Sequence, residues 1–236
     1  MDAPCPISEN RKHDSTTCLR SAFERLVSPL MLRQLALALL CLMPLAVIAE
    51  QENTPSPPKV RLKTNHGDIV IELNPEKAPI TTANYLKYVR EKHYDGTVFH
   101  RVIDQFMIQG GGFAQDDGKL IEKATSGDGI KNESDNGLKN ARGTIAMART
   151  ADPDSARAQF FINVADNPAL DFPSNGGYAV FGKVIEGMET VDKIKALKTN
   201  EAPLVMRHPE TGEPIEMPAR DVPAEPVVIE SAVIVE

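Results

Sequence analysis

Apolar and polar residues alternate along two neighbouring segments, Lys59–Lys63 and Ile69–Leu73. A polar break, Asn65–Asp68, separates the two segments. A repeat of two places successive apolar side chains on the same face of a strand. The two segments therefore predict a β-hairpin that buries one of its faces.

Further short runs with strand character follow, separated by glycine-rich or polar loops. They are Thr97–Ile103, Phe106–Gln109, Gly143–Ala148, Gln159–Val164, Ala179–Val184 and Val227–Val235. Many short strands with few helices favour either a closed barrel or a sandwich with capping helices. The pattern alone does not choose between these two architectures.

Two segments have the apolar spacing of a helix. The first opens at Pro79, because proline is tolerated in the first helical turn, where its missing N–H would be unpaired in any case. Its predicted buried side carries Ile80, Ala83, Leu86 and Val89. The second segment, Met188–Leu197, places Met188, Val191 and Ile194 on one face.

Two stretches are interpreted as long loops. Gly110–Asn140 is rich in Gly, Asp, Lys and Asn, and Asn200–Pro226 carries six prolines without a regular period. Loops of this length are uncommon in compact domains unless they have a function. The first stretch is therefore a candidate rim of a binding groove.

An apolar run, Leu35–Ile48, follows a basic residue and ends before a polar stretch that begins at Glu50. Such an order is typical of a secretory signal peptide. The run of about 14 residues contains Pro44 and is short for a spanning helix, which needs ~20. We expect residues 31–49 to be a signal that is cleaved near Ala49, and we expect the mature protein in the periplasm. An uncleaved anchor or a buried core helix stays open.

The remaining boundaries follow from composition. Residues 1–30 are polar and mixed in charge, which indicates either a start placed too early, with Met31 as the true start, or a disordered extension. Residues 50–58 are polar and proline-rich and are interpreted as a linker. Residues 59–236 are then the folded domain.

Composition excludes several classes of function. The chain of 236 residues has a formal net charge of −7 and no dense basic run, so it shows no electrostatic footprint for nucleic acid. Its three cysteines, Cys5, Cys18 and Cys41, all precede the predicted domain. The domain therefore has no thiolate nucleophile, disulfide framework or cysteine-based metal site.

Four motifs stand in order along the domain. They are Phe99–Phe113 (Phe-His-Arg-Val-Ile-Asp-Gln-Phe-Met-Ile-Gln-Gly-Gly-Gly-Phe), Gly143–Ala148, Gln159–Ile162 and Val180–Val184. Together they resemble the signature of the cyclophilins, most of all the short bacterial periplasmic members. The resemblance covers about residues 58–236.

This resemblance implies a mostly β fold, an eight-stranded closed antiparallel β-barrel capped by two α-helices, with the active groove on the outside of the barrel. It implies peptidyl-prolyl cis–trans isomerase activity on proline-containing unfolded or partly folded polypeptides. It also implies a monomer without cofactor or metal. No stable membrane insertion is expected once the signal has been cleaved.

The resemblance also assigns the site, position by position. Arg101 carries the catalytic guanidinium, and Gln109 is its polar neighbour. Phe106, Met107, Phe161 and Leu170 form the proline pocket. Ala148, Arg149, Gln159 and Tyr178 complete the substrate-binding residues.

Three positions depart from the best-known eukaryotic pattern. Arg149 replaces an asparagine, and Tyr178 stands near a pocket histidine in a loosely aligned loop. Two roles stay open for Arg149: contact with the substrate, or a solvated position on the rim of the groove. Ala169 replaces a tryptophan, which suggests weak cyclosporin binding without a threat to catalysis.

These residue types suit the reaction, which is rotation about a C–N bond with a barrier of ~18–20 kcal/mol. In the twisted amide the proline nitrogen recovers a lone pair, so a donor aimed at that nitrogen stabilises the transition state more than the ground state. Arginine suits this task because it is always charged and has several donors in a rigid fork. An apolar pocket would grip the ring and exclude water.

Other interpretations of single residues are weaker. Phe160 alternates with Phe161 and should face the core, and His100 should be structural because its neighbour Arg101 faces the groove. Gly110–Gly112 lacks the rest of a phosphate-binding loop. Asp152 and Asp154, with Glu133 and Asp135, have a spacing that fits no EF-hand, and solvated loop acids are expected instead.

Two other classes of function stay open at this point. The same groove could hold proline-containing segments as a chaperone without turnover. A structural or adhesive role lacks any repeat or any anchor beyond the leader. The chaperone hypothesis would gain support if cells with the Arg101→Ala protein kept the wild-type phenotype.

Overall fold

The computed structural model describes residues 56–208 and 211–235, which belong to one unit of the chain, Pro55–Glu236. Residues 1–30, the predicted signal at 31–49 and most of the predicted linker at 50–58 lie outside the described residues. The first strand begins at Lys59, where the domain was predicted to begin.

Strands are the main regular elements of the described structure. They are β1 (Lys59–Thr64), β2 (Gly67–Leu73), β3 (Thr97–Ile103), β4 (Met107–Asp116), β5 (Lys119–Glu122), β6 (Thr144–Met147), β7 (Phe160–Asn163), β8 (Val180–Glu186), β9 (Thr199–Arg207), β10 (Pro214–Pro223) and β11 (Ile229–Val235). Two helices, α3 (Pro79–Arg90) and α4 (Met188–Lys195), and three short 3₁₀ turns, η1 (Pro153–Ser155), η2 (Pro168–Leu170) and η3 (Ser174–Gly176), complete it.

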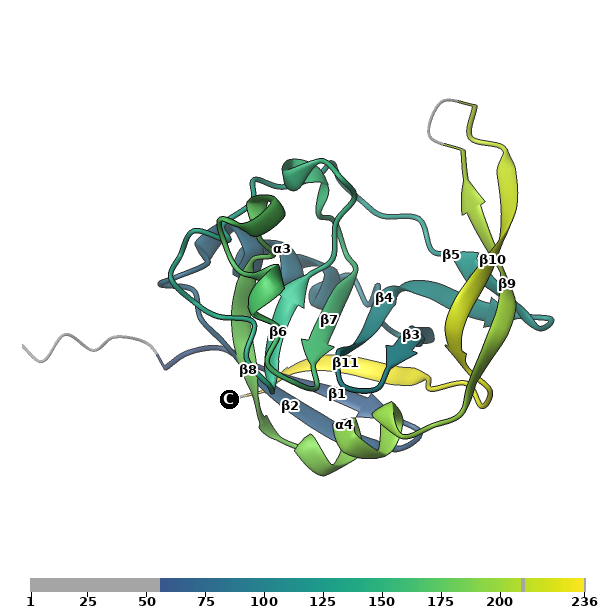
Figure 1. The fold of residues 1–236 in the computed structure, drawn as a ribbon, viewed down its shortest axis with the longest axis horizontal. Helices are drawn as coiled ribbons and strands as arrows, with labels where there is room; N and C mark the ends of the chain where they lie inside the picture. Colours follow the sequence, from purple (N-terminus) through teal and green to yellow (C-terminus); the bar gives the residue numbers. More distant parts are fainter. Residues whose placement is uncertain (1–55, 209–210, 236) are drawn as a thin grey trace, which may run out of the picture. The chain divides into compact units, whose positions relative to one another are not determined.

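All strands belong to one sheet, in the order β10-β9-β5-β4-β7-β6-β8-β2-β1-β11, with β3 paired to β4 (Figure 1). The predicted mostly β fold with two helices is confirmed. The prediction of eight strands in a closed antiparallel barrel is wrong in count and in closure. The sheet has eleven strands, β5 and β9 run parallel, and between β3 and β11 the described residues form an isolated bridge, Val98 to Val228, in place of a ladder.

The extra strands come from the two stretches predicted as loops. Gly110–Asp116 continues β4 and is followed by β5, while Thr199–Pro223 forms the hairpin of β9 and β10, a long twisted ribbon in Figure 1. The β9–β10 hairpin was not predicted because its segment is rich in proline. Pro203 stands opposite Pro218, and because antiparallel pairs alternate between bonded and non-bonded positions, two residues without N–H groups can share a non-bonded one.

The predicted β-hairpin at the start of the domain is confirmed. β1 and β2 pair with Leu62 opposite Ile69, and both side chains are fully buried. The turn between the strands ends at Gly67, whose φ is +129°. A Cβ at this position would lie 2.7 Å from the hydroxyl of Thr190 in α4, so glycine lets the helix dock on the hairpin.

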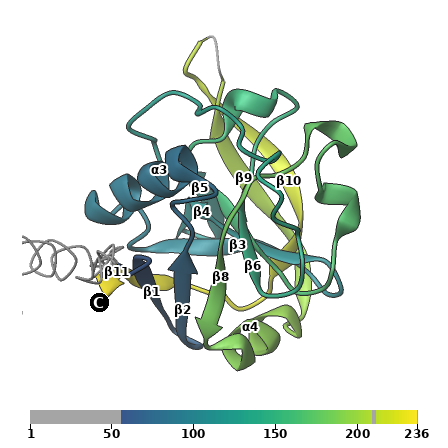
Figure 2. The same cartoon turned by 90° about the vertical axis from the view of Figure 1, so that its left-hand side faces the viewer.

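The two helices lie at opposite ends of the strands (Figure 2). In α4 the predicted face is confirmed, with Val191 and Ile194 buried. In α3 the predicted face is wrong in part, because Ile80 and Ala83 are exposed. The helix turns Tyr85 and Tyr88 inward instead, since large aromatic side chains bury more area than alanine or isoleucine. Backbone N–H groups at the start of α3 donate to Glu133, which was predicted to be a solvated loop acid.

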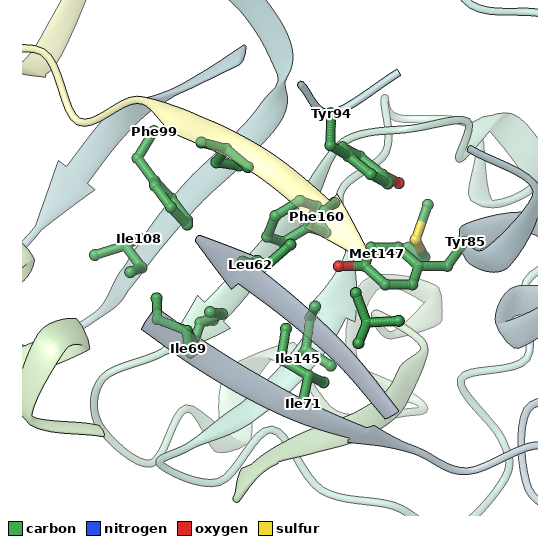
Figure 3. Close-up of a cluster of buried hydrophobic side chains, with 14 of the residues drawn as sticks. Leu62, Ile69, Ile71, Tyr85, Tyr94, Phe99, Ile108, Ile145, Met147 and Phe160 are labelled. Carbon is green, nitrogen blue, oxygen red and sulfur yellow. The ribbon is translucent and has the colours of Figure 1, made fainter. Parts of the chain in front are cut away.

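The main core is formed by the sheet together with both helices, α3 and α4. Figure 3 shows side chains from β1, β2, β3, β4, β6, β7 and α3 meeting in one apolar cluster, with Phe160 among them. The ring of Phe160 packs edge-on against those of Tyr85, Tyr94 and Phe99. One face of the central strands is therefore fully occupied by the core, which leaves the other face for a site.

Candidate active site

Strand pairing places five residues in a single row across the outer face of the sheet. Arg101 on β3 lies opposite Gln109 on β4, which lies opposite Phe161 on β7, which lies opposite Ala146 on β6, which lies opposite Val180 on β8. Residues directly opposite each other project from the same face. Phe160, one position from Phe161, faces the core as predicted. The row therefore runs from a cation to apolar side chains on the outside of the sheet.

An apolar cluster surrounds the apolar end of this row, from Phe161 to Val180. Its buried members are Met107, Ala146, Phe161 and Val180, and its half-buried members are Ile103, Phe106, Leu138, Ala148, Leu170 and Tyr178. The four residues predicted for the proline pocket thus lie in one cluster, together with Ala148 and Tyr178. A hydrophobic patch of this kind, half open to solvent, suits a small apolar ring.

Gln109 and Gln159 meet beside the cluster. The side-chain amide of Gln109 donates from Nε2 to Oε1 of the Gln159 side chain at 3.0 Å. A Cβ at Gly112 would lie 2.4 Å from Cγ of Gln159, so the glycine leaves space for that side chain. The pair presents polar groups between Arg101 and the apolar patch, as their assignment to the groove predicts.

Arg101 is half-buried and points into the groove. Its side chain is 44% exposed, and its Nε lies 3.9 Å from Oδ2 of Asp221 on β10. Gln109, the polar neighbour of Arg101 in the sequence interpretation, donates its Nε2–H to Gln159 and makes no hydrogen bond with the guanidinium among the described residues. Asp221 was missed because it lies in a segment that was predicted to be a loop.

Arg149 packs against the loop that carries Tyr178. Its guanidinium donates to the carbonyl oxygens of Thr150, Asn175 and Gly177 at 2.6–3.1 Å. It also lies 4.3 Å above the ring of Tyr178, which in turn packs edge-on against Phe161. Arg149 therefore fixes the loop that carries Tyr178 and supports the pocket wall from behind.

A buried asparagine network holds the rest of the wall, and the sequence interpretation missed it. Asn167 donates to the carbonyl of Phe106 at 2.8 Å and to Oδ1 of Asn163 at 2.7 Å. Asn140 donates to the carbonyl of Leu170 at 3.1 Å. Asparagine is common in loops, so only its burial, which the sequence does not show, distinguishes this network.

His100 lies on the core side of β3, as predicted for a structural residue. It is 6% exposed and packs edge-on against Phe113, with ring centroids 4.7 Å apart. Burial, reinforced by the positive charge of Arg101, lowers the pKa of His100 to about 4. A histidine that is neutral and faces away from the groove has no acid–base role there.

The site contains the elements for conformational catalysis. Its functional groups are a fixed cation, two amides and an apolar patch. Among the described residues no group of three or more His, Cys, Asp or Glu side chains could hold a metal ion. No described helix is long and apolar enough to cross a membrane.

Comparison with known proteins decides what kind of enzyme this is. The family described as "Cyclophilin type peptidyl-prolyl cis-trans isomerase/CLD" matches residues 59–232. The chain belongs to the cyclophilin family. Peptidyl-prolyl cis–trans isomerisation is its activity.

Several similar proteins carry the same activity in their names. A peptidyl-prolyl cis-trans isomerase, cyp18, of Streptomyces antibioticus is 52% identical over 177 residues, which are 73% of this chain and 96% of that protein. Peptidyl-prolyl cis-trans isomerase B of Escherichia coli is 49% identical over 181 residues, 75% of this chain and 99% of that protein. The crystal structure of a Cryptosporidium parvum cyclophilin superposes with a TM-score of 0.58 at 27% identity, covering 76% of this chain and 98% of that one.

The cyclophilin family explains why the outward row is the part of the sheet with functional side chains. Proline-containing peptides are the substrates of this family. An extended peptide needs an open surface, and the interior of the sheet is filled by Phe160 and its neighbours. The face that carries Arg101 and Phe161 is therefore the face of the central strands that the core leaves open.

Proposed function

We propose that this cyclophilin accelerates X–Pro rotation in exported polypeptides as they fold, with Arg101 as the catalytic residue. The observation that carries the proposal is the outward row itself. It sets a guanidinium next to an apolar patch that contains Phe106, Met107, Phe161 and Leu170. A related cyclophilin structure was obtained in the presence of the dipeptide Ala-Pro.

The apolar patch receives the proline ring. Burial of the ring against Phe161 and Met107 holds it in place while the residue before proline rotates. Exclusion of water from the patch strengthens the electrostatic interaction with Arg101, because the local dielectric constant falls. The asparagine network keeps the backbone of Phe106 in position during this rotation.

Arg101 acts on the proline nitrogen. In the planar amide the nitrogen lone pair is delocalised, and in the twisted amide it is localised and can accept a hydrogen bond. The guanidinium therefore binds the transition state more tightly than either planar isomer, which is the requirement for catalysis. No bond is made or broken, and no proton is transferred.

The substrate backbone lies along the Gln159 side of the groove. The N–H of Ala148 already donates to the carbonyl of Gln159 at 2.9 Å, so alignment of the peptide falls to the backbone of Arg149 and to the Gln109 and Gln159 side chains. An extended peptide added in this way obtains main-chain hydrogen bonds without requiring a particular sequence. This arrangement suits an enzyme that acts on many unfolded chains as a monomer.

A proline-limited refolding assay tests this role. Arg101→Ala should lower the catalysed rate by about 10²- to 10³-fold, the usual loss when a donor to the transition state is removed. Arg61→Ala is a matched control, because Arg61 is 46% exposed and pairs with Asp68 at 3.8 Å, yet lies on β1. Arg101→Ala with wild-type activity and Arg61→Ala with reduced activity would contradict the assignment.

The location is proposed from the leader alone, which lies outside the described residues. The apolar run before Glu50 supports export to the periplasm and cleavage near Ala49. Sequencing the N-terminus of protein from a periplasmic extract should give a chain that begins near Glu50. A chain found only in the cytoplasm, or one that begins at Met1 or Met31, would contradict this location.

A further inference from the structure

Asp221 is the one ion partner of Arg101 among residues 56–208 and 211–235. Its Oδ2 lies 3.9 Å from Nε of Arg101, and the two side chains are 42% and 44% exposed. Gln109, the cross-strand neighbour of Arg101, donates its Nε2–H to Gln159 and makes no hydrogen bond with Arg101 among the described residues. The group next to the guanidinium is therefore a carboxylate from the β9–β10 hairpin.

A β-bulge directs Asp221 towards Arg101. Ala219 stands opposite Ala202 and Val222 opposite Asn200, so two residues of β10 face one residue of β9. Asp221, in this bulge, has a φ of 60°, a left-handed conformation that glycine and asparagine adopt more readily than other residues. Bulges of this kind redirect a side chain and are frequent beside active sites.

The residue after the bulge is anchored. Val222 is 7% exposed and belongs to a second apolar cluster with Val98, Phe113 and Leu120. Val98 lies on β3, the strand that carries Arg101, and Phe113 lies on β4. The base of the hairpin is therefore packed on the strands of the groove, which fixes the carboxylate relative to the guanidinium.

We propose that Asp221 is a positioning residue for Arg101. Its carboxylate holds the Nε edge of the guanidinium, so that the two terminal amino groups stay available for the proline nitrogen. A long side chain that is ordered before the substrate binds loses less conformational freedom in the transition state. This inference rests on the proposed role of Arg101 and extends it to a residue on the hairpin.

Two variants separate the charge of Asp221 from its backbone. Asp221→Asn removes the charge and Asp221→Gly removes the side chain, and both residues suit the left-handed conformation, so the fold is kept. Both should lower kcat about fivefold with KM unchanged, as expected for an ion pair at a partly exposed site. The control is Glu216→Gln, which removes another half-exposed ion pair of β10, that with Lys119, and should leave kcat unchanged.

A double-mutant cycle distinguishes positioning from a structural effect. In an Arg101→Lys background, measured at high enzyme concentration, Asp221→Asn should have no further effect, because lysine has no Nε edge to hold. Equal losses in both backgrounds, or a kcat for both single variants within twofold of wild type, would overturn the inference while Arg101 keeps its role. Wild-type activity in Arg101→Lys and Arg101→Ala would overturn both proposals.

Discussion

His100 and Arg101 are adjacent on β3 and differ completely in environment. The pairing of β3 with β4 is irregular between Phe99 and Arg101, so Arg101 lies on the outward row although Phe99 faces the main core, while His100 is buried with its ring packed on Phe113. Burial lowers the pKa of His100 to about 4, so the ring is neutral in the folded protein at neutral pH. An unfolded chain has a histidine pKa near 6.5 and binds a proton more readily. The histidine beside Arg101 therefore links the stability of the folded protein to pH.

The folded protein should lose stability as the pH falls from about 6.5 to 4. In this window the unfolded chain takes up a proton at position 100 and the folded protein does not, so unfolding is favoured by up to about 3 kcal/mol. Urea unfolding at several pH values measures this effect. His100→Gln should remove most of the slope, while His93, whose pKa burial also lowers, keeps the remainder. An unchanged slope in His100→Gln would show that His100 is not the cause.

Two loop residues and the last residue of a strand form the asparagine network beside the apolar cluster. Asn140 precedes β6, Asn163 ends β7 and Asn167 precedes η2, and their side chains form one buried network. Asn163 also donates to the hydroxyl of Thr144 at 2.9 Å. Buried amides fix loop geometry only when all of them find partners, since an unpaired buried polar group is costly. The network thus ties Phe106 and Leu170 to the sheet.

Asn163→Ala should lower the free energy of unfolding by about 2–3 kcal/mol, because it leaves the amides or hydroxyl of its partners unpaired. It should also raise KM for a proline peptide, since Asn167 holds the carbonyl of Phe106. Asn84→Ala in α3 is the control, because its hydrogen bond to the carbonyl of Arg157 is exposed and the residue takes no part in the asparagine network. Equal destabilisation by the two variants would mean that the network has no special role.

Across the whole molecule, the alternation of apolar and polar residues along single strands was the most reliable sequence signal. It predicted the first hairpin, the strands that carry the site, and the opposite faces of Phe160 and Phe161. It failed for Gly110–Asp116, β9 and β10, because Gly and Pro count against strands in any local interpretation. In the structure these segments are strands because they pair with other strands, for example where Pro203 of β9 lies opposite Pro218 of β10.

Site residues on strands with a clear sequence pattern could likewise be predicted, and those on other segments could not. The row from Arg101 to Phe161 could be assigned because each member lies on a strand with a recognisable motif. Arg149 and Tyr178 were placed near the site without their mutual contact, which depends on how the 172–178 loop folds. Asp221 could not be found, because its position depends on a bulge in an unpredicted hairpin.

The central claim is that rotation takes place on the outward row and depends on Arg101. Exchange spectroscopy of a short X–Pro peptide by NMR, with wild-type protein and with Arg101→Ala, tests it most directly. With wild type, cis–trans exchange should become far faster than its uncatalysed time of tens to hundreds of seconds, and amide shifts should centre on Gln109, Phe161 and Ala148. Arg101→Ala should keep these shifts and lose most of the exchange. Exchange as fast as wild type in that variant, or shifts centred elsewhere, would contradict the claim.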